Sequence, residues 1–146
     1  MKRSRRLEPV VKVAENHEKQ AAKALGDSQT ALAQTQQRLS ELEHYREEYL
    51  KRFHSAGAVG MSAAQMADYR LFLANLDGAI TEQERVVQRA AAVVEQHRQA
   101  WFNRRGKVKV LDSVVARYQA DERRDEDRKE QNDQDDRTQH TPKTSF

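Results

Sequence analysis

The sequence predicts an all-α fold, a long antiparallel two-helix coiled-coil hairpin with a disordered C-terminal tail. Three observations predict it. Apolar residues recur at alternating four- and three-residue spacings over two long stretches, the glycine-containing segment SAGAVGMS at 55–62 separates these stretches, and the last residues are nearly all polar. An average spacing of 3.5 residues is typical of a coiled coil, because supercoiling keeps such a stripe facing one partner helix.

The composition favours long helices over a thick globular core. The chain has 146 residues, of which 37% are hydrophobic and 34% are charged, whereas a typical globular domain is nearly half apolar. The excess polar residues are mostly strong helix formers. The chain has no cysteine, which excludes disulfides and thiolate metal sites. No apolar run is long enough for a signal sequence or a membrane span, so we expect a soluble intracellular protein.

The first helix is expected over about 7–56. Alternating four- and three-residue steps from Leu7 meet fourteen residues, ten of them apolar or aromatic. This first seam consists of Leu7, Val11, Ala14, Glu18, Ala21, Leu25, Ser28, Leu32, Thr35, Leu39, Leu42, Arg46, Tyr49 and Phe53. Pro9 fits the first turn of a helix but not its interior, so we expect the helix to begin near Leu7 or Glu8.

The turn is expected at 57–61. Gly57 can end the first helix in a left-handed conformation, and Gly60 relaxes the turn. Ser62 and Gln65 match a capping box, in which each side chain accepts a hydrogen bond from a free main-chain N–H at the start of a helix. So short a link favours antiparallel neighbours, which brings residues 42–53 opposite roughly 66–76.

The second helix is expected over about 62–125. The same stepping from Met66 meets sixteen residues, thirteen of them apolar or aromatic. This second seam consists of Met66, Tyr69, Leu73, Leu76, Ile80, Gln83, Val87, Ala90, Val94, His97, Trp101, Arg104, Val108, Leu111, Val115 and Tyr118. Gly78 and Gly106 each weaken the helix by about 1 kcal/mol but do not interrupt the seam, although Gly106 could mark a local bend.

The C-terminal segment differs from both helices. From residue 119 onward its only hydrophobic residues are Ala120 and Phe146, although paired charges can carry the helix to about 125 or 130. The remainder cannot bury enough surface to offset the entropy of ordering it. We therefore expect a hairpin domain over 1–130 and a disordered charged tail over 131–146.

No pattern in the chain indicates catalysis. None of the common nucleophile, phosphate-loop or zinc motifs occurs. The five histidines are too widely spaced for a metal site, and His97 on the second seam fits a hydrogen-bonded core residue better than a ligand. A two-helix hairpin also lacks a deep pocket that excludes water. We expect no enzymatic activity, no metal and no cofactor.

The chain has two basic clusters, one ahead of the first helix and one within the second. In an antiparallel hairpin both lie toward the end opposite the turn, where they form either a solvated charged face or a basic surface for an acidic partner. No aromatic residue is interleaved with these cations, which argues against nucleic acid. The clusters are KRSRR at 2–6 and RRGKVK at 104–109, with cations at Lys2, Arg3, Arg5, Arg6, Arg104, Arg105, Lys107 and Lys109.

The stretch LEHYREEYLKRF at 42–53 suggests a second kind of surface. Tyr45 lies on the shoulder of the first seam, and Phe72 lies on a shoulder of the second. They either widen a two-stranded core or form an exposed aromatic patch, which usually marks a partner site. Arg46 lies on the seam itself, where its stem can cover apolar surface while its charge stays in water.

Several segments in order resemble the FliJ proteins of the bacterial flagellar type III export apparatus. The resemblance covers about residues 5–130 and rests on LEPVVKVAE, ELEHYREEYLKRF, MADYRLFLANLDGAITEQERVV, Trp101 and the Lys-Val-Leu segment before Arg117. It implies a non-enzymatic antiparallel coiled-coil stalk that sits in the export ATPase hexamer and couples it to the export gate, with a role in recycling export chaperones.

The resemblance also implies partners and a site. The expected partners are the flagellar export ATPase hexamer, the cytoplasmic domain of the gate protein and export chaperones, with the chain a monomer in isolation. The expected location is cytoplasmic, peripheral to the inner face of the cell membrane at the flagellar base. Arg38 and Gln83 depart from the family pattern at the edges of the site. The gate-binding residues carried over are Leu42, Tyr45, Tyr49, Phe72, Leu76 and Ala79. The basic end is expected to contact the ATPase ring.

Three alternatives stay open from the sequence. A stalk protein of a virulence injectisome would share the fold and differ in genomic neighbourhood. A homodimeric coiled-coil scaffold would dimerise with concentration, whereas a self-closed hairpin would stay monomeric. A nucleic-acid binder would show a steep dependence of DNA affinity on salt.

Overall fold

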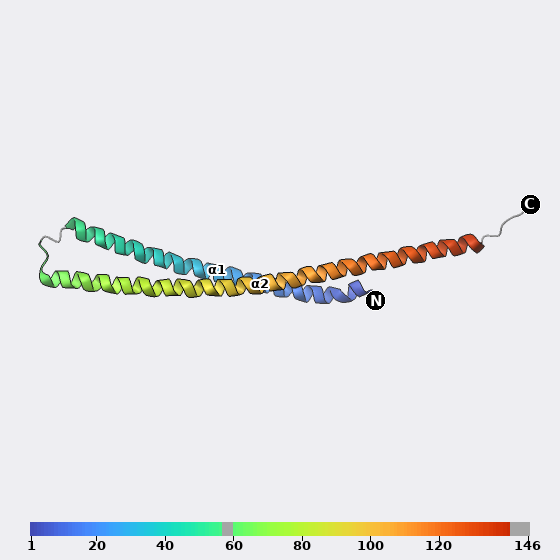
Figure 1. Cartoon of the computed structure of the whole chain (residues 1–146), viewed down its shortest axis with the longest axis horizontal. Helices are drawn as coiled ribbons and strands as arrows, with labels where there is room; N and C mark the ends of the chain where they lie inside the picture. Colours follow the sequence, from blue (N-terminus) through green and yellow to red (C-terminus); the bar gives the residue numbers. More distant parts are fainter. Residues whose placement is uncertain (57–59, 141–146) are drawn as a thin grey trace, which may run out of the picture. The chain divides into compact units, whose positions relative to one another are not determined.

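The structure is a computed structural model that describes residues 1–56 and 60–140. It contains two long α-helices, α1 over Arg3–Ala56 and α2 over Ala63–His140 (Figure 1), and no strand within the described residues. These helices confirm the all-α fold class. The chain divides into two compact units, one formed by Met1–Gln20 with Phe102–Phe146 and the other by Ala21–Trp101. The first is the terminal unit and the second is the turn unit.

In the turn unit, α1 and α2 run antiparallel. The side-chain amide of Gln83 donates a hydrogen bond of 3.0 Å to the main-chain carbonyl of Thr35. Nearer the turn, the rings of Phe53 and Tyr69 stack with their centroids 3.9 Å apart. Rising residue numbers on α1 therefore face falling numbers on α2. The pairing confirms the predicted register of residues 42–53 against roughly 66–76.

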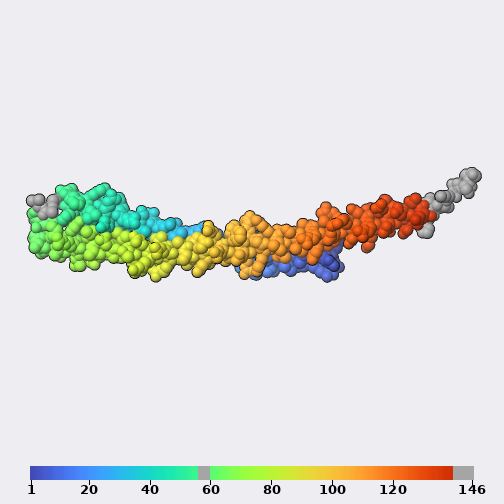
Figure 2. Space-filling model, in the orientation of Figure 1, coloured from blue at the N-terminus to red at the C-terminus, as the bar shows by residue number. Residues whose placement is uncertain are grey.

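In the terminal unit, the first turns of α1 also lie antiparallel to α2. Ser4 binds Glu122, and Nδ1 of His17 lies 3.3 Å from Nη1 of Arg104. Figure 2 shows the corresponding blue and orange-red segments in contact.

The predicted seams account for the buried residues. All fourteen residues of the first seam are buried or half-buried, as are fifteen of the sixteen on the second. The exception is Arg104, which is exposed and contacts His17. His97 is half-buried, as expected for a seam position. Two helices cannot enclose a thick core. Among the described hydrophobic residues only Leu76 is buried, with 7% of its surface exposed.

Helix α1 begins at Arg3, four residues before the predicted start at Leu7, so Pro9 lies inside the helix and not in its first turn. Without an N–H, Pro9 cannot donate to the carbonyl of Arg5, and an interior proline costs about 3 kcal/mol. Contacts with α2 offset this cost, because the N–H and hydroxyl of Ser4 both donate to the Glu122 carboxylate. The predicted start of this helix near Leu7 or Glu8 is therefore wrong, because contacts with α2 stabilise a start at Arg3.

Helix α2 extends past its predicted end at about 125 and reaches His140. It is helical through Gly78 and Gly106. The predicted disordered tail is therefore helical over 131–140, and residues 141–146 lie outside the described residues. Every residue over 123–139 is exposed, so this extension rests on helix-forming residues and on charge pairs such as Arg124 with Asp121, 2.6 Å apart.

The link between the helices matches most of its prediction. The N–H of Ser62 donates to Oε1 of Gln65 at 3.0 Å, and the N–H of Gln65 donates to Oγ of Ser62 at 3.1 Å. This reciprocal pair is the predicted capping box, and α2 begins one residue after Ser62. Gly60 has φ of 106°, a left-handed value that favours glycine. The predicted role of Gly57 falls outside the described residues.

Candidate partner-binding site

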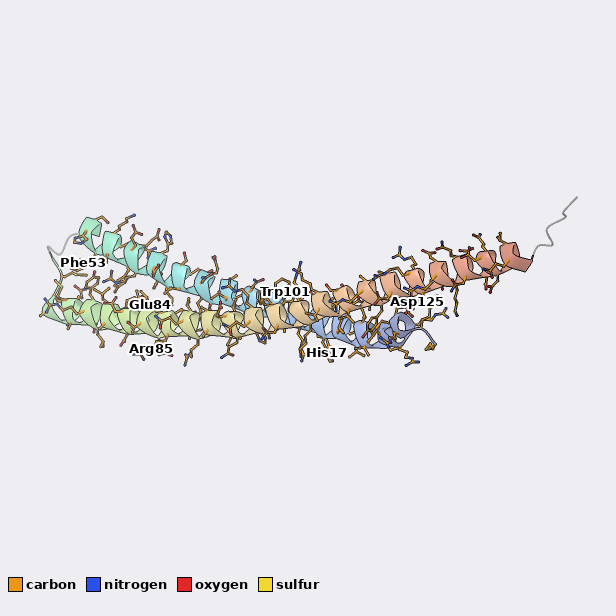
Figure 3. The ribbon with its side chains drawn as sticks, turned by 45° about the vertical axis from the view of Figure 1, so that its right-hand side comes forward. His17, Phe53, Glu84, Arg85, Trp101 and Asp125 are labelled. Carbon is orange, nitrogen blue, oxygen red and sulfur yellow. The ribbon has the colours of Figure 1, made fainter. Side chains whose placement is uncertain are left out.

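Five aromatic rings gather in the turn unit next to the link. Tyr45, Tyr49 and Phe53 are four residues apart on α1, and Tyr69 and Phe72 are three apart on α2, so each set shares one helix face. The ring centroids of Tyr49 lie 5.1 Å from Tyr69 and 4.5 Å from Phe72. The centroids of Tyr45 and Phe72 are 6.1 Å apart in an edge-on arrangement. Together they form a continuous aromatic cluster across both helices, and Figure 3 labels Phe53 within it.

The cluster is buried on one side and open on the other. Tyr49, Phe53 and Tyr69 are half-buried at the seam. Tyr45 keeps 50% of its surface exposed and Phe72 keeps 37%. The two shoulder rings therefore touch each other and extend the core, yet they still present apolar surface to solvent. We call Tyr45 and Phe72 the aromatic patch.

Leu71 is an exposed apolar residue that the sequence reasoning missed. It precedes Phe72 on α2 and has 62% of its surface exposed. The stepping pattern passes over it, because it lies neither on the seam nor on the shoulder that was considered. Consecutive residues on a helix point about 100° apart, so Leu71 is a separate exposed apolar side chain next to the face that carries Phe72.

Arg46 reaches from the seam to an acidic partner on the other helix. Its Nε donates to Oδ1 of Asp77 at 2.5 Å, and the two side chains remain 39% and 50% exposed. The stem lies at a half-buried seam position while the guanidinium is at the surface, as the sequence predicted. Asp77 was not anticipated, since only the paired register places it opposite Arg46.

The remaining predicted gate residues divide between core and surface. Leu42 is half-buried and Leu76 is buried, so both belong to the seam and not to the exposed surface. Ala79 is exposed. Gln83 is 8% exposed and engaged with Thr35, so at this edge of the expected surface its side chain lies inside the structure. Arg38 at the other edge is exposed.

The hydroxyl of Tyr69 is buried and has no hydrogen-bond partner among the described residues. Its ring stacks between Tyr49 and Phe53. Burying a hydroxyl without a partner costs about 1–3 kcal/mol, so the aromatic packing must compensate for this loss.

The two basic clusters lie in the terminal unit but opposite different partners. Lys2 forms an ion pair with Glu126, and the Arg3 guanidinium lies 5.7 Å from the centroid of the Tyr118 ring. Arg104 instead lies beside His17. The clusters thus face α2 residues 118–126 and α1 residues near 17 respectively, and they do not merge into one patch.

Contacts between the N-terminal residues and α2 shift the pKa values of two groups, Glu122 on α2 and Lys2 just before α1. The main-chain and then the side-chain hydrogen bonds from Ser4 lower the pKa of Glu122 below its ordinary value. The hydrogen bond and charge of Glu126 raise the pKa of Lys2. Both charged forms are therefore favoured by the pairing of the two helices.

In the part of the chain that the structure describes, no group of three or more histidine, aspartate or glutamate side chains is arranged to hold a metal ion.

Within the same described residues, no helix has the length and apolar character needed to cross a membrane.

The fold and the patch define a class of protein built from paired long antiparallel helices, with an aromatic cluster beside the turn. The model of the family described as flagellar FliJ protein matches residues 2–144. The chain therefore belongs to the FliJ family, and the resemblance seen in the sequence is confirmed. A search of curated proteins found no match. Membership supports a role related to flagellar protein export.

Proposed function

We propose that this chain is a non-enzymatic stalk of the flagellar export apparatus that sits in the export ATPase ring and couples it to the membrane export gate. Recycling of export chaperones is part of the proposed role. The family match over residues 2–144 is the observation that carries the proposal. Coupling by a stalk needs two partner surfaces and no chemistry of its own. The aromatic patch and the basic clusters are candidates for these surfaces.

The proposed gate-binding surface is the aromatic patch with its supporting residues. Tyr45 and Phe72 offer exposed rings, the Tyr49 ring packs against Phe72, and Leu42 and Leu76 lie at the seam. Exposed aromatic residues backed by a packed layer are typical energetic centres of protein interfaces. Arg46 and Asp77 add a charged rim on the same unit.

The gate proposal is tested by calorimetry with the cytoplasmic domain of the gate protein. Tyr45→Ala and Phe72→Ala should each weaken binding at least about tenfold, with helical content and melting temperature nearly unchanged. Phe102→Ala is the matched control, since Phe102 is 70% exposed but belongs to the terminal unit. Unchanged affinity in both patch variants would refute the gate surface. Should either variant unfold, Ala79→Glu tests the same surface, because Ala79 is exposed and lies two helical turns from Phe72 on one face of α2.

The proposed contact with the ATPase ring uses the basic clusters of the terminal unit. Arg5 and Arg6 are exposed and precede the first seam residue. Arg5→Glu with Arg6→Glu should weaken binding to the ATPase hexamer, and the affinity of the wild-type chain should fall with salt. A salt-independent affinity that the double variant retains would exclude this contact.

The self-closed hairpin and the homodimeric scaffold predict different oligomeric states. Helix-to-helix contacts within one chain, such as Gln83 with Thr35, favour a self-closed hairpin over a homodimeric scaffold. Sedimentation equilibrium should therefore give a monomer across a wide concentration range, and a concentration-dependent dimer would favour the scaffold. The family match favours a flagellar over an injectisome role.

A further inference from the structure

A second apolar surface lies in the terminal unit, away from the seam. Three valines there are exposed to solvent, with 48% of the surface of Val10, 53% of Val13 and 64% of Val110 accessible. They belong to a groove between the start of α1 and the facing part of α2. The groove is lined by Val10, Val13, Ala14, His17, Asn103, Arg104, Gly106, Lys107, Val110 and Leu111.

The groove follows one face of each helix. On α1, Val10, Val13 and His17 are three and four residues apart, so they share a stripe beside the seam. On α2, Gly106 and Val110 are four apart and form the facing stripe. A Cβ added at Gly106 would meet nothing within 4 Å, so the glycine leaves the middle of this face open. The α1 stripe is about 10 Å long at 1.5 Å per residue.

The charged residues that line the groove, Arg104 and Lys107, are both basic. His17, Arg104 and Lys107 line it, and none of the lining residues is acidic. Arg104 is exposed and its guanidinium contacts the imidazole of His17. Figure 3 labels His17 on the α1 segment of this unit. An apolar floor with only cationic groups at its edge is complementary to a ligand that is apolar in the middle and anionic at its sides.

We propose that this groove binds an amphipathic helix of another protein that carries carboxylates beside its apolar stripe. A third helix laid along two antiparallel helices fits ridges into grooves and turns local two-helix packing into three-helix packing. Two or three apolar side chains at helical spacing would cover the valines. Asp or Glu residues on the flanks would meet Arg104 and Lys107.

A second copy of this chain is a poorer occupant. Its most acidic segment, residues 121–136, contains no apolar side chain to cover the groove floor. Its apolar stripes are the seams, which already face the paired helix. The proposal concerns a surface and a ligand chemistry separate from the aromatic patch, so it stands or fails independently of gate binding.

The ligand chemistry is tested by selection. A phage library of helical peptides with randomised faces is panned against the full chain, with the Val13→Glu variant present as competitor. We expect enriched peptides to carry apolar residues at i, i+3 or i+4, and i+7, with Asp or Glu beside them. Failure to enrich any clone, or enrichment of peptides with neutral or basic flanks, would overturn the proposal.

The location is tested by fluorescence anisotropy with an enriched peptide. Val13→Glu and Lys107→Glu should each weaken binding about tenfold or more. The controls are Val93→Glu, since Val93 is 43% exposed in the turn unit, and Lys12→Glu, an exposed lysine outside the groove lining. Both should bind within about twofold of wild type. Equal loss in the controls, or a wild-type dimer that Val13→Glu dissociates, would contradict a foreign acidic helix.

Discussion

The side-chain amide of Gln83 donates a 3.0 Å hydrogen bond to the main-chain carbonyl of Thr35, joining α2 to α1 within the turn unit. Both residues are seam positions, and Gln83 is only 8% exposed. A single polar residue inside a coiled-coil seam fixes register, because any slip leaves its amide buried without a partner. This bond therefore helps to keep the aromatic residues of α1 opposite those of α2.

Gln83→Ala should lower the free energy of unfolding by about 1–2 kcal/mol, through loss of the hydrogen bond and of buried volume. Gln88→Ala is the matched control, since it makes the same change in helix propensity at an exposed position of α2. Urea unfolding followed by circular dichroism measures both. Equal stability of the two variants would mean that the interhelical bond contributes nothing.

Alanine substitutions in the aromatic cluster should distinguish core rings from surface rings by how much thermal stability each one costs. Tyr49 contacts both Tyr69 and Phe72 at the seam, so Tyr49→Ala should cost about 2–3 kcal/mol. Tyr45 is half exposed, and Tyr45→Ala should cost less than about 1 kcal/mol. Thermal unfolding of the two variants gives the comparison. A large loss for Tyr45→Ala would assign that ring to the core.

Two glycines should respond to alanine with opposite signs. Gly60 has φ of 106°, where a side chain is strained, so Gly60→Ala should destabilise by about 1 kcal/mol. Gly78 lies inside α2 with nothing within 4 Å of an added Cβ, so Gly78→Ala should stabilise by about 1 kcal/mol. Melting temperatures suffice as the readout. A rise for both variants would be inconsistent with a left-handed Gly60.

The capping box predicts that removing the Ser62 hydroxyl destabilises the start of α2. Ser62→Ala removes the acceptor of the Gln65 N–H and should lower stability by about 1 kcal/mol. Ser113→Ala, an exposed site inside α2, makes the same chemical change but should raise helix propensity. Chemical unfolding of both chains tests the difference in sign, which would disappear if the cap were not formed.

The contact of Ser4 with Glu122 predicts a dependence on pH. The pKa of Glu122 is below its ordinary value of 4.5 in the folded chain, so its stabilising contribution is complete above that value. The contribution is lost as the pH falls through the lower folded pKa. Ser4→Ala should raise the pKa of Glu122 by removing the hydroxyl donor. Carbon-13 NMR titration of the carboxyl group measures the shift, and an unchanged pKa would refute the side-chain bond.

The sequence by itself determined the two seams, the capping box and the turn around Gly60. These features follow from local spacing, since seven-residue periodicity and turn chemistry act within a few residues.

Only the tertiary structure decided how α1 starts, which charges pair and which residues stay open. The Glu122 carboxylate stabilises a start at Arg3 that Pro9 argued against. Asp77 meets Arg46, and Leu71 remains exposed, because each depends on the rotation of one helix against the other. Residues distant in sequence determine that rotation, so no pattern within a single helix encodes it.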